Sequence, residues 1–176
     1  GYLARMTTQA AQKLGVNVAV LDKDEHSPAS QVTAYAIDGD WNDLELVSEF
    51  AATCDAVTVE SEEVPVHVLK QLEAEGRVVR PSSQTVALLR DRLIQKQTLA
   101  AAGFPVVAHA AIESIDDLRT FVATHKQAVL KTRTGGDDSR GNALIKTAAD
   151  VQPMFERISS LGVPMMAEAF VSAYRE

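Results

Sequence analysis

The sequence predicts an α/β protein of two lobes, a lobe with a parallel sheet followed by a small α+β lobe. Apolar, β-branched runs alternate with helical patterns from residue 16 to residue 80, which is typical of parallel strands joined by crossover helices. After residue 103 the pattern changes. The strand-like runs 127–131 and 142–146 are separated by a single polar loop, which favours an antiparallel sheet. A content of 46% hydrophobic and 23% charged residues fits a folded chain rather than a disordered one.

Composition excludes several classes of function. The 176 residues include 17 Lys and Arg against 24 Asp and Glu, a net charge of −7, whereas a general nucleic-acid binder needs a basic surface. No run approaches the roughly 20 apolar residues that cross a bilayer. Cys54 is the single cysteine, which excludes a disulfide framework and a multi-cysteine zinc site. We therefore expect a cytoplasmic protein without a nucleic-acid or membrane partner.

The chain opens with a helical pattern that Gly15 ends. Four apolar residues at spacings of three and four share one face of this helix: Leu3, Met6, Ala10 and Leu14. The run 16–21 then predicts a buried strand. A helix and a strand with Gly1 in front of them resemble a βαβ unit that lacks its first strand. We therefore expect a trimmed chain, and a native terminus on a surface helix is the alternative.

The rest of the first lobe continues the alternation. It predicts a loop over 22–30, a helix over 41–54, a strand over 55–60, a helix that Pro65 opens and a strand at 78–79. Ligands of parallel sheets bind beyond the carboxyl ends of the strands. Five carboxylates lie at such ends: Asp22, Asp24, Glu60, Glu62 and Glu63. The alternative for each of them is a helix cap or a solvated side chain.

The second lobe combines helices with short strands. A long helix is predicted over 85–102, ended by Gly103. Ser114, with an aspartate three residues later, fits the N-cap of another helix, and Pro153 should confine the regular part of the last helix to one side of that residue. The strand-like runs are 106–112, 127–131, 142–146 and 163–167.

The most informative segment is a glycine-rich loop between two of these strands, Lys131-Thr-Arg-Thr-Gly-Gly-Asp-Asp-Ser-Arg-Gly-Asn142. Glycine permits unusual dihedrals and lets backbone N–H groups approach phosphate oxygens closely. Lys131 and Arg140 would add positive charge for a polyphosphate. No Gly-Lys-Ser/Thr follows the glycines, so the loop is not of the Walker type. An ordinary exposed hairpin turn is the alternative.

Other charged residues favour phosphate binding over the plain turn. Arg92 and Lys96 lie one turn apart on a predicted helix, and the carboxylates of Glu168 and Glu176 follow a buried strand. Such carboxylates can accept hydrogen bonds from ribose hydroxyls or from an amino group. The simpler interpretation places them at solvated ends.

Seven segments, taken in order, resemble the ATP-grasp family, and within it the synthetases that carboxylate aminoimidazole ribonucleotide. They are GYLARM, EEVP, RPS, DRLIQKQTL, VLKTRTGG, DDSRGN and EAFVSAYRE. The resemblance covers essentially the whole chain and implies a pre-ATP-grasp, Rossmann-like domain over 1–83, linking helices over 84–103 and the first, small ATP-grasp subdomain over 104–176. Gly1 matches the last glycine of the family's N-terminal turn, so the chain looks truncated at both ends.

The resemblance also implies site residues and partners. The nucleotide positions are Arg92, Lys131, Gly136, Asp137, Asp138, Ser139, Arg140, Gly141, Asn142, Glu168, Ala169, Phe170, Val171 and Glu176, with Asp138 and Arg140 as catalytic residues. The positions for the ribonucleotide substrate are Gly1, Tyr2, Leu3, Glu60 and Glu62. The implied substrates are ATP, bicarbonate and aminoimidazole ribonucleotide. The Mg²⁺ ligands are expected beyond Glu176, with no metal site in this chain, and the full-length protein is expected to be a homodimer.

The loop departs from the family pattern, because Asp137 replaces a tyrosine and Ser139 a glycine, and Tyr2 stands where glutamine is usual. Without the metal ligands, the chain by itself is expected to be inactive. Three alternatives remain: a related formyl-phosphate or glycinamide-type ligase, a catalytically silent nucleotide-binding module, and a plain Rossmann-type dinucleotide binder.

Overall fold

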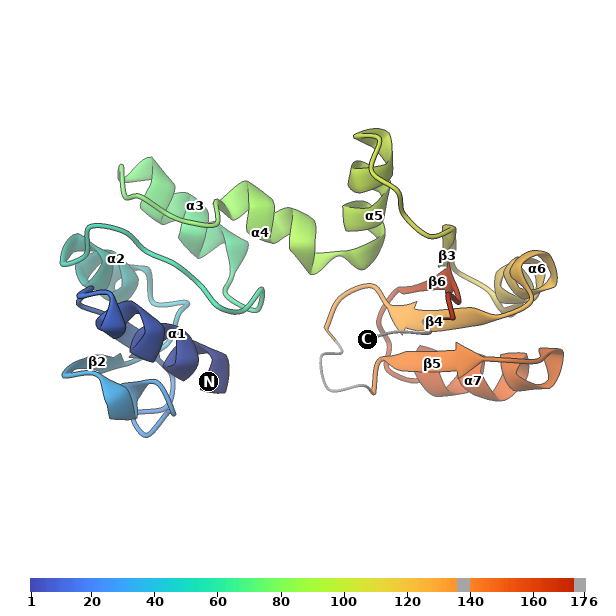
Figure 1. Ribbon diagram of the computed structural model, residues 1–176, viewed down its shortest axis with the longest axis horizontal. Coiled ribbons are helices and arrows are strands. Elements are labelled where there is room, and N and C mark those ends of the chain that lie inside the picture. The colour runs from blue at the N-terminus through green and yellow to red at the C-terminus, as the bar shows by residue number, and fades with distance from the viewer. Residues whose placement is uncertain (136–139, 173–176) are drawn as a thin grey trace. The chain divides into compact units, whose positions relative to one another are not determined.

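The computed structural model describes residues 1–135 and 140–172 and divides the chain into two compact units, Gly1–Ala87 and Leu88–Glu176. In Figure 1 the colour runs from blue to green through unit 1 and from green to red through unit 2. No helix within the described ranges is both long and apolar enough to span a membrane. The finer division with linking helices over 84–103 stays a prediction.

Unit 1 has parallel pairing as predicted, but the runs predicted as strands over 55–60 and at 78–79 form only an isolated bridge. Strand β1 runs parallel to β2, and a separate parallel bridge joins Val57 to Val79. The elements are α1 (Tyr2–Lys13), β1 (Ala19–Asp22), η1 (Ser30–Val32), β2 (Tyr35–Asp38), α2 (Leu44–Ala52), α3 (Val66–Ala74) and α4 (Ser83–Arg90), which continues past Ala87. The sequence analysis missed β2, because all four of its residues are exposed and it lacks the apolar run of a buried strand.

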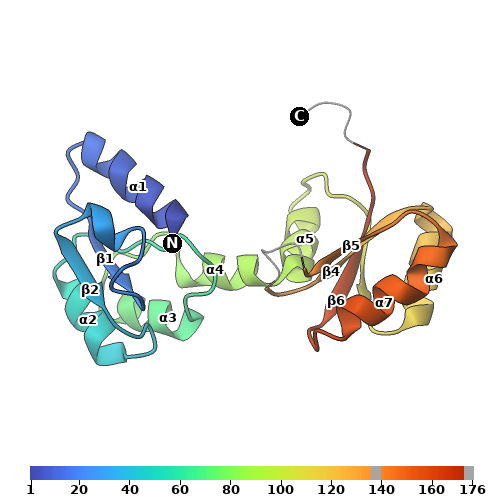
Figure 2. The same ribbon diagram turned by 90° about the horizontal axis from the view of Figure 1, so that it is seen from below.

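The core of unit 1 lies between its helices and strands, and it consists of Val47, Ala51, Val68, Leu69, Leu72, Val79 and Val86. Of the apolar residues predicted to share one face of α1, Leu3, Met6 and Leu14 are 63%, 66% and 83% exposed, so this face is not buried. Figure 2 shows α1 at the outer edge of this unit. Periodicity tells which side chains share a face, but whether another element covers that face depends on the tertiary structure.

Unit 2 is the predicted α+β lobe with an antiparallel sheet. Its strand order is β3-β6-β4-β5, and every neighbouring pair is antiparallel. The elements after α4 are α5 (Arg92–Ala101), β3 (His109–Ile112), α6 (Ile115–His125), β4 (Ala128–Thr132), β5 (Asn142–Ile145), η2 (Ala148–Asp150), α7 (Val151–Ser159) and β6 (Met165–Ala169).

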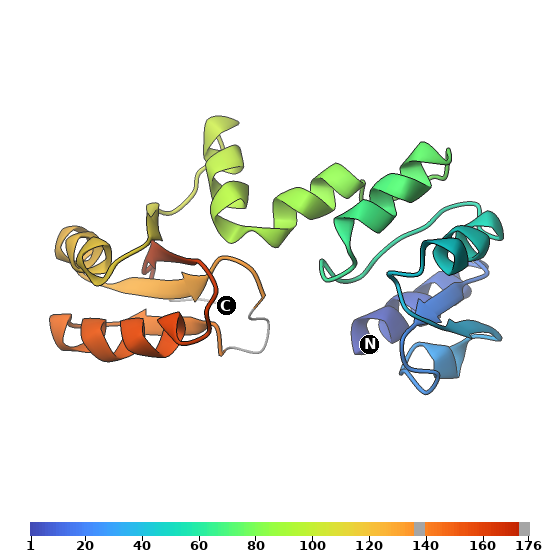
Figure 3. The ribbon, with the colours of Figure 1, turned by 180° about the vertical axis from the view of Figure 1, so that it is seen from behind.

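The two faces of this sheet have different environments. Alternate side chains point to opposite faces of a strand, and the residues of one face pack with α6 and α7 into a core that includes Leu118, Leu130, Ile145, Ile158 and Ala167. Figure 2 and Figure 3 show α7 on one side of the sheet and α5 on the other. Lys131 and Glu168 alternate with core residues Leu130 and Ala167, so they belong to the face on the α5 side.

Two local predictions at helix starts have different outcomes. The N-cap at Ser114 is confirmed, because its hydroxyl accepts from the N–H of Asp117 and the Asp117 carboxylate accepts from the N–H of Ser114. Pro153 does not confine α7, which begins at Val151 and runs through it. The proline lies in the first turn, where the missing N–H has no partner within the helix.

The single helix predicted over 85–102 is wrong, because the chain breaks at Asp91 into α4 and α5. Asp91 is the N-cap of α5, and its carboxylate accepts from the N–H groups of Leu93 at 2.9 Å and Ile94 at 3.2 Å. Nε of Arg133, just beyond β4, donates to both Asp91 oxygens at 3.1 Å. The carbonyl of Arg133 accepts from the N–H of Arg92 at 2.9 Å. The start of α5 is therefore attached to the end of β4.

We predict that Asp91→Asn lowers the free energy of unfolding of the full-length protein by about 1–3 kcal/mol at neutral pH. Burial alone would raise the pKa of Asp91, but the hydrogen bonds from Arg133 and from the N–H groups of Ile94 and Leu93 outweigh it, and the pKa is lowered. A lowered folded-state pKa stabilises the fold above the unfolded-state pKa, and the stabilisation disappears as pH falls through the folded-state pKa.

Denaturant unfolding of wild type and Asp91→Asn between neutral pH and about pH 3 tests this. The difference between the two proteins should shrink on the acid side of about pH 4. The control is Asp116→Asn, which removes an exposed pair with Arg119 on α6 and should change stability little. A difference that stays constant across this pH range would contradict the role of the Asp91 charge.

Candidate nucleotide site

A buried carboxylate lies between two lysines on the α5 side of the unit 2 sheet. Glu168 is 9% exposed. Its Oε2 accepts a hydrogen bond from Nζ of Lys131 at 2.9 Å, and Nζ of Lys96 lies 3.3 Å from its Oε1. Each oxygen of one carboxylate thus faces a different ammonium group.

The three side chains come from three elements, and strand register brings two of them together. Glu168 is near the end of β6, an inner strand, where its neighbours are His109 on β3 and Val129 on β4. Lys131 is two residues beyond Val129 and therefore shares its face of the sheet. Lys96 reaches the same carboxylate from α5.

Arg92 lies beside this cluster at the first position of α5, one turn before Lys96. Its guanidinium donates to the carbonyl of Gly135 at 3.4 Å, at the start of the glycine-rich loop. The sequence predicted Arg92 and Lys131 as residues of one nucleotide site. Both belong to unit 2, and the contacts between Asp91 and Arg133 join the elements that carry them.

The glycine-rich loop joins β4 to β5, as predicted. Gly141 accepts from the N–H of Thr132 at 2.9 Å, and Asn142 pairs with Lys131 across the hairpin. Arg157 of α7 donates to the carbonyls of Arg140 and Asn142. The other predicted nucleotide residues of this loop, with one at the chain end, lie outside the described residues: Gly136, Asp137, Asp138, Ser139 and Glu176.

Strand β6 ends at Ala169, one residue after Glu168. The N–H of Ala169 donates to the carbonyl of Ala108 at 2.8 Å, and the N–H of Phe170 donates to that of Gln127 at 3.1 Å. The side chains of Phe170 and Val171 are 40% and 63% exposed. Phe170 is thus an accessible aromatic side chain two residues from the carboxylate of Glu168. A ligand with an aromatic ring and an amino group can pack against the first and donate a hydrogen bond to the second.

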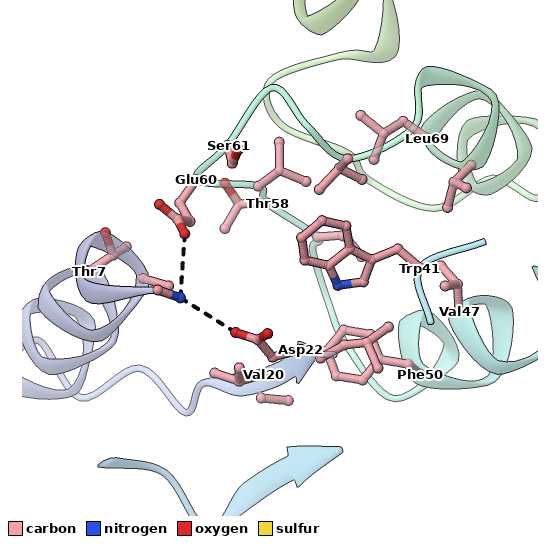
Figure 4. A pocket seen from close by; sticks show the side chains of 18 of the residues that line it. Thr7, Val20, Asp22, Trp41, Val47, Phe50, Thr58, Glu60, Ser61 and Leu69 are labelled. Carbon is pink, nitrogen blue, oxygen red and sulfur yellow. Dashed lines mark hydrogen bonds and ion pairs between the residues drawn. The ribbon is translucent and has the colours of Figure 1, made fainter. Parts of the chain in front are cut away.

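Unit 1 contains a separate cavity of about 610 Å³ at the ends of its strands. Figure 4 shows the backbone nitrogen of Gly1 between two carboxylates, 3.4 Å from Asp22 and 3.7 Å from Glu60, with Trp41 in the wall. Burial alone would raise the pKa of Asp22, but hydrogen bonds from Ser27 and from the N–H of Asp24 outweigh it and lower the pKa.

The predicted substrate residues are only partly brought together. Gly1 and Glu60 line the cavity, whereas Tyr2, Leu3 and Glu62 do not. Tyr2 and Leu3 are 76% and 63% exposed on α1, because they lie on the helix face that points away from the unit's interior.

Sequence reasoning missed several residues that shape these sites. Asp91 and Arg133 fix the start of α5, and Trp41 lines the cavity of unit 1, where Asp22 was predicted as a carboxylate at a strand end. A signal existed for Asp91, because aspartate is a preferred N-cap and disfavours a helix interior. Arg133 follows Lys131 by two residues, but its pairing with Asp91 depends on the tertiary structure. Trp41 gave no signal.

Within residues 1–135 and 140–172, no three His, Cys, Asp or Glu side chains are grouped so that they could hold a metal ion.

Comparison with protein families matches two models in succession. Residues 1–90 match the ribonucleotide synthetase preATP-grasp domain, and residues 97–176 match the ATP-grasp domain. The chain is 37% identical over 177 residues to the N5-carboxyaminoimidazole ribonucleotide synthase of Mycobacterium tuberculosis, a match that covers all of this chain and 41% of that protein.

Two solved structures are similar to this chain. N5-carboxyaminoimidazole synthetase from Staphylococcus aureus in complex with ADP has a TM-score of 0.85 at 32% identity, over 98% of this chain and 46% of that one. The enzyme of Aspergillus clavatus, in complex with ADP and 5-aminoimidazole ribonucleotide, has a TM-score of 0.83 at 28% identity, over 99% and 45%. The chain spans less than half the length of these relatives. It belongs to the family of the ribonucleotide synthetase preATP-grasp domain, followed here by an ATP-grasp domain.

Proposed function

We propose that the full-length protein uses ATP to carboxylate 5-aminoimidazole ribonucleotide with bicarbonate, a step of purine biosynthesis. The observation that carries the proposal is the cluster of Lys131, Glu168 and Lys96, with Arg92 next to it, at the base of the glycine-rich loop. A polyphosphate requires cations and backbone N–H groups, and an adenine requires an acceptor for its amino group. The named relatives and the nucleotide-bound structures support the same assignment.

In this proposal, Lys131 and Arg92 bind the phosphates of ATP. The loop from Gly136 to Asn142 covers them, with Asp138 and Arg140 close to the reacting groups. Glu168, together with the segment up to Val171, accepts the adenine. Glu176 binds the ribose hydroxyls. The loop would exclude water, which protects a reactive acyl phosphate from hydrolysis.

The chemistry has two steps. An oxygen of bicarbonate attacks the γ-phosphorus of ATP, the bond to the β-phosphate oxygen breaks, and ADP leaves with carboxyphosphate as the product. The exocyclic amine of aminoimidazole ribonucleotide then forms a bond with the carboxyl carbon, the carbon–oxygen bond to phosphate breaks, and the amine loses a proton. Fixed cations at the phosphates stabilise the charge that develops in the first step.

We place the ribonucleotide in unit 1, at the cavity beside Gly1 and Glu60, with Tyr2, Leu3 and Glu62 as further contacts that the family resemblance implies. Carboxylates there accept from sugar hydroxyls or from the amine. Magnesium would be held by residues beyond Glu176 and would supply positive charge at the phosphates of ATP. We further propose a cytoplasmic homodimer for the full-length protein.

The first prediction tests the reaction. The full-length protein with ATP and bicarbonate should release inorganic phosphate at a rate that rises strongly when aminoimidazole ribonucleotide is added. The control omits bicarbonate and should lose the stimulated release. Tight ATP binding with no stimulated release would contradict the proposal and would favour a catalytically silent nucleotide-binding module.

The second prediction tests the phosphate contacts. Lys131→Ala and Arg92→Ala in the full-length protein should each raise the KM for ATP by about ten- to hundredfold, since a hydrogen bond to a charged group contributes about 1.5–3 kcal/mol. Lys146→Ala, an exposed lysine of the same unit, is the matched control and should leave this KM unchanged. Unaltered ATP kinetics in both test variants would remove Lys131 and Arg92 from the site.

A further inference from the structure

We propose that Lys96 is a positioning residue of the nucleotide site, which retains the charge of Glu168 while Lys131 turns to the phosphates of ATP. The inference rests on the proposed ATP-binding function. It assigns a role to a side chain that the predicted set of nucleotide residues did not include.

Glu168 has two ammonium partners, although one is enough to neutralise its charge. Nζ of Lys131 is 2.9 Å from Oε2 of Glu168, and Nζ of Lys96 is 3.3 Å from Oε1. The side chains of Lys131, Lys96 and Glu168 are 25%, 21% and 11% exposed. Of the side chains that the structure describes, only these two lysines form ion pairs with Glu168.

Because Glu168 is buried, the presence of Lys96 decides how tightly the carboxylate holds Lys131. A carboxylate that loses its counterion inside a protein retains the full cost of desolvation, so an ammonium that is its single partner is held tightly. With both lysines present the cluster has a net charge of +1. One ammonium can therefore leave for another anion while Glu168 and the remaining lysine stay neutral as a pair.

Lys131 is the one that can leave for the phosphates. It is next to last in β4, directly before the glycine-rich loop, and pairs with Asn142 at the far side of that loop. Lys96 lies in the second turn of α5, whose start is held by the hydrogen bonds that Arg133 donates to Asp91. The two lysines thus have different tasks, since one binds the substrate and the other compensates the carboxylate.

The test measures the dissociation constant of ATP with the full-length protein. Lys96→Met should weaken ATP binding by about tenfold or more, because Lys131 then becomes the single counterion of a buried carboxylate. Lys96→Arg retains the charge and should stay within about twofold of wild type. Lys146→Met is the matched surface control and should bind like wild type. Thermal unfolding of each variant reports whether it is folded.

The same substitution in the Glu168→Gln variant distinguishes the positioning role of Lys96 from a purely structural role. In Glu168→Gln there is no carboxylate to capture Lys131, so adding Lys96→Met should change the ATP dissociation constant by less than about twofold. The same loss in both backgrounds would show that Lys96 acts without Glu168 and would overturn the inference. If the single Lys96→Met variant does not fold, the ATP dissociation constants of Glu168→Gln and of the double variant are compared with each other. A clear loss of affinity in the double variant would then overturn the inference.

The outcomes distinguish the two proposals. If Lys131→Ala weakens ATP binding but Lys96→Met does not, the role of Lys96 is wrong and the ATP site stands. If the wild-type protein does not bind ATP, the proposed function fails and the inference fails with it.

Discussion

A charged carboxylate inside a sheet needs a counterion, and in unit 2 this requirement organises the face on which the site lies. Glu168 is on an inner strand, where neighbouring strands occupy both edges and solvent access is small. The two cations that face it come from β4 and α5, so both elements must stay in place for the charge to be compensated. In the proposed function, Lys131 is also the cation that binds the phosphates of ATP.

The position of α5 follows from a half-buried ion pair between Asp91 and Arg133. Asp91 ends one helix and caps the next, and Arg133 holds the carboxylate from the end of β4. Arg92 and Lys96 then project from the first two turns of a helix whose beginning is hydrogen-bonded to Arg133, just beyond the strand that carries Lys131. A charge pair outside the nucleotide contacts therefore fixes the distances between the cations of the site.

Much of the fold and part of the site could be predicted from local patterns. The capping box at Ser114, the glycine-rich loop and the carboxylate at the end of a buried strand each have a signal within a few residues. The break at Asp91 was missed because the helical period continues across it. Periodicity placed the apolar residues of α1 on one face, but it does not report whether another element covers that face. The pairing of Lys96 with Glu168 joins residues far apart in the chain, and only the register of β6 with β4 and the course of α5 bring them together.

The most direct measurement is a crystal structure of the full-length protein with a bound, non-hydrolysable ATP analogue. The account predicts that Nζ of Lys131 has left Oε2 of Glu168 and lies within hydrogen-bond distance of a phosphate oxygen, while Lys96 still contacts the carboxylate. A structure in which Lys131 stays on Glu168 with the analogue bound, or in which the analogue occupies another part of unit 2, would contradict it.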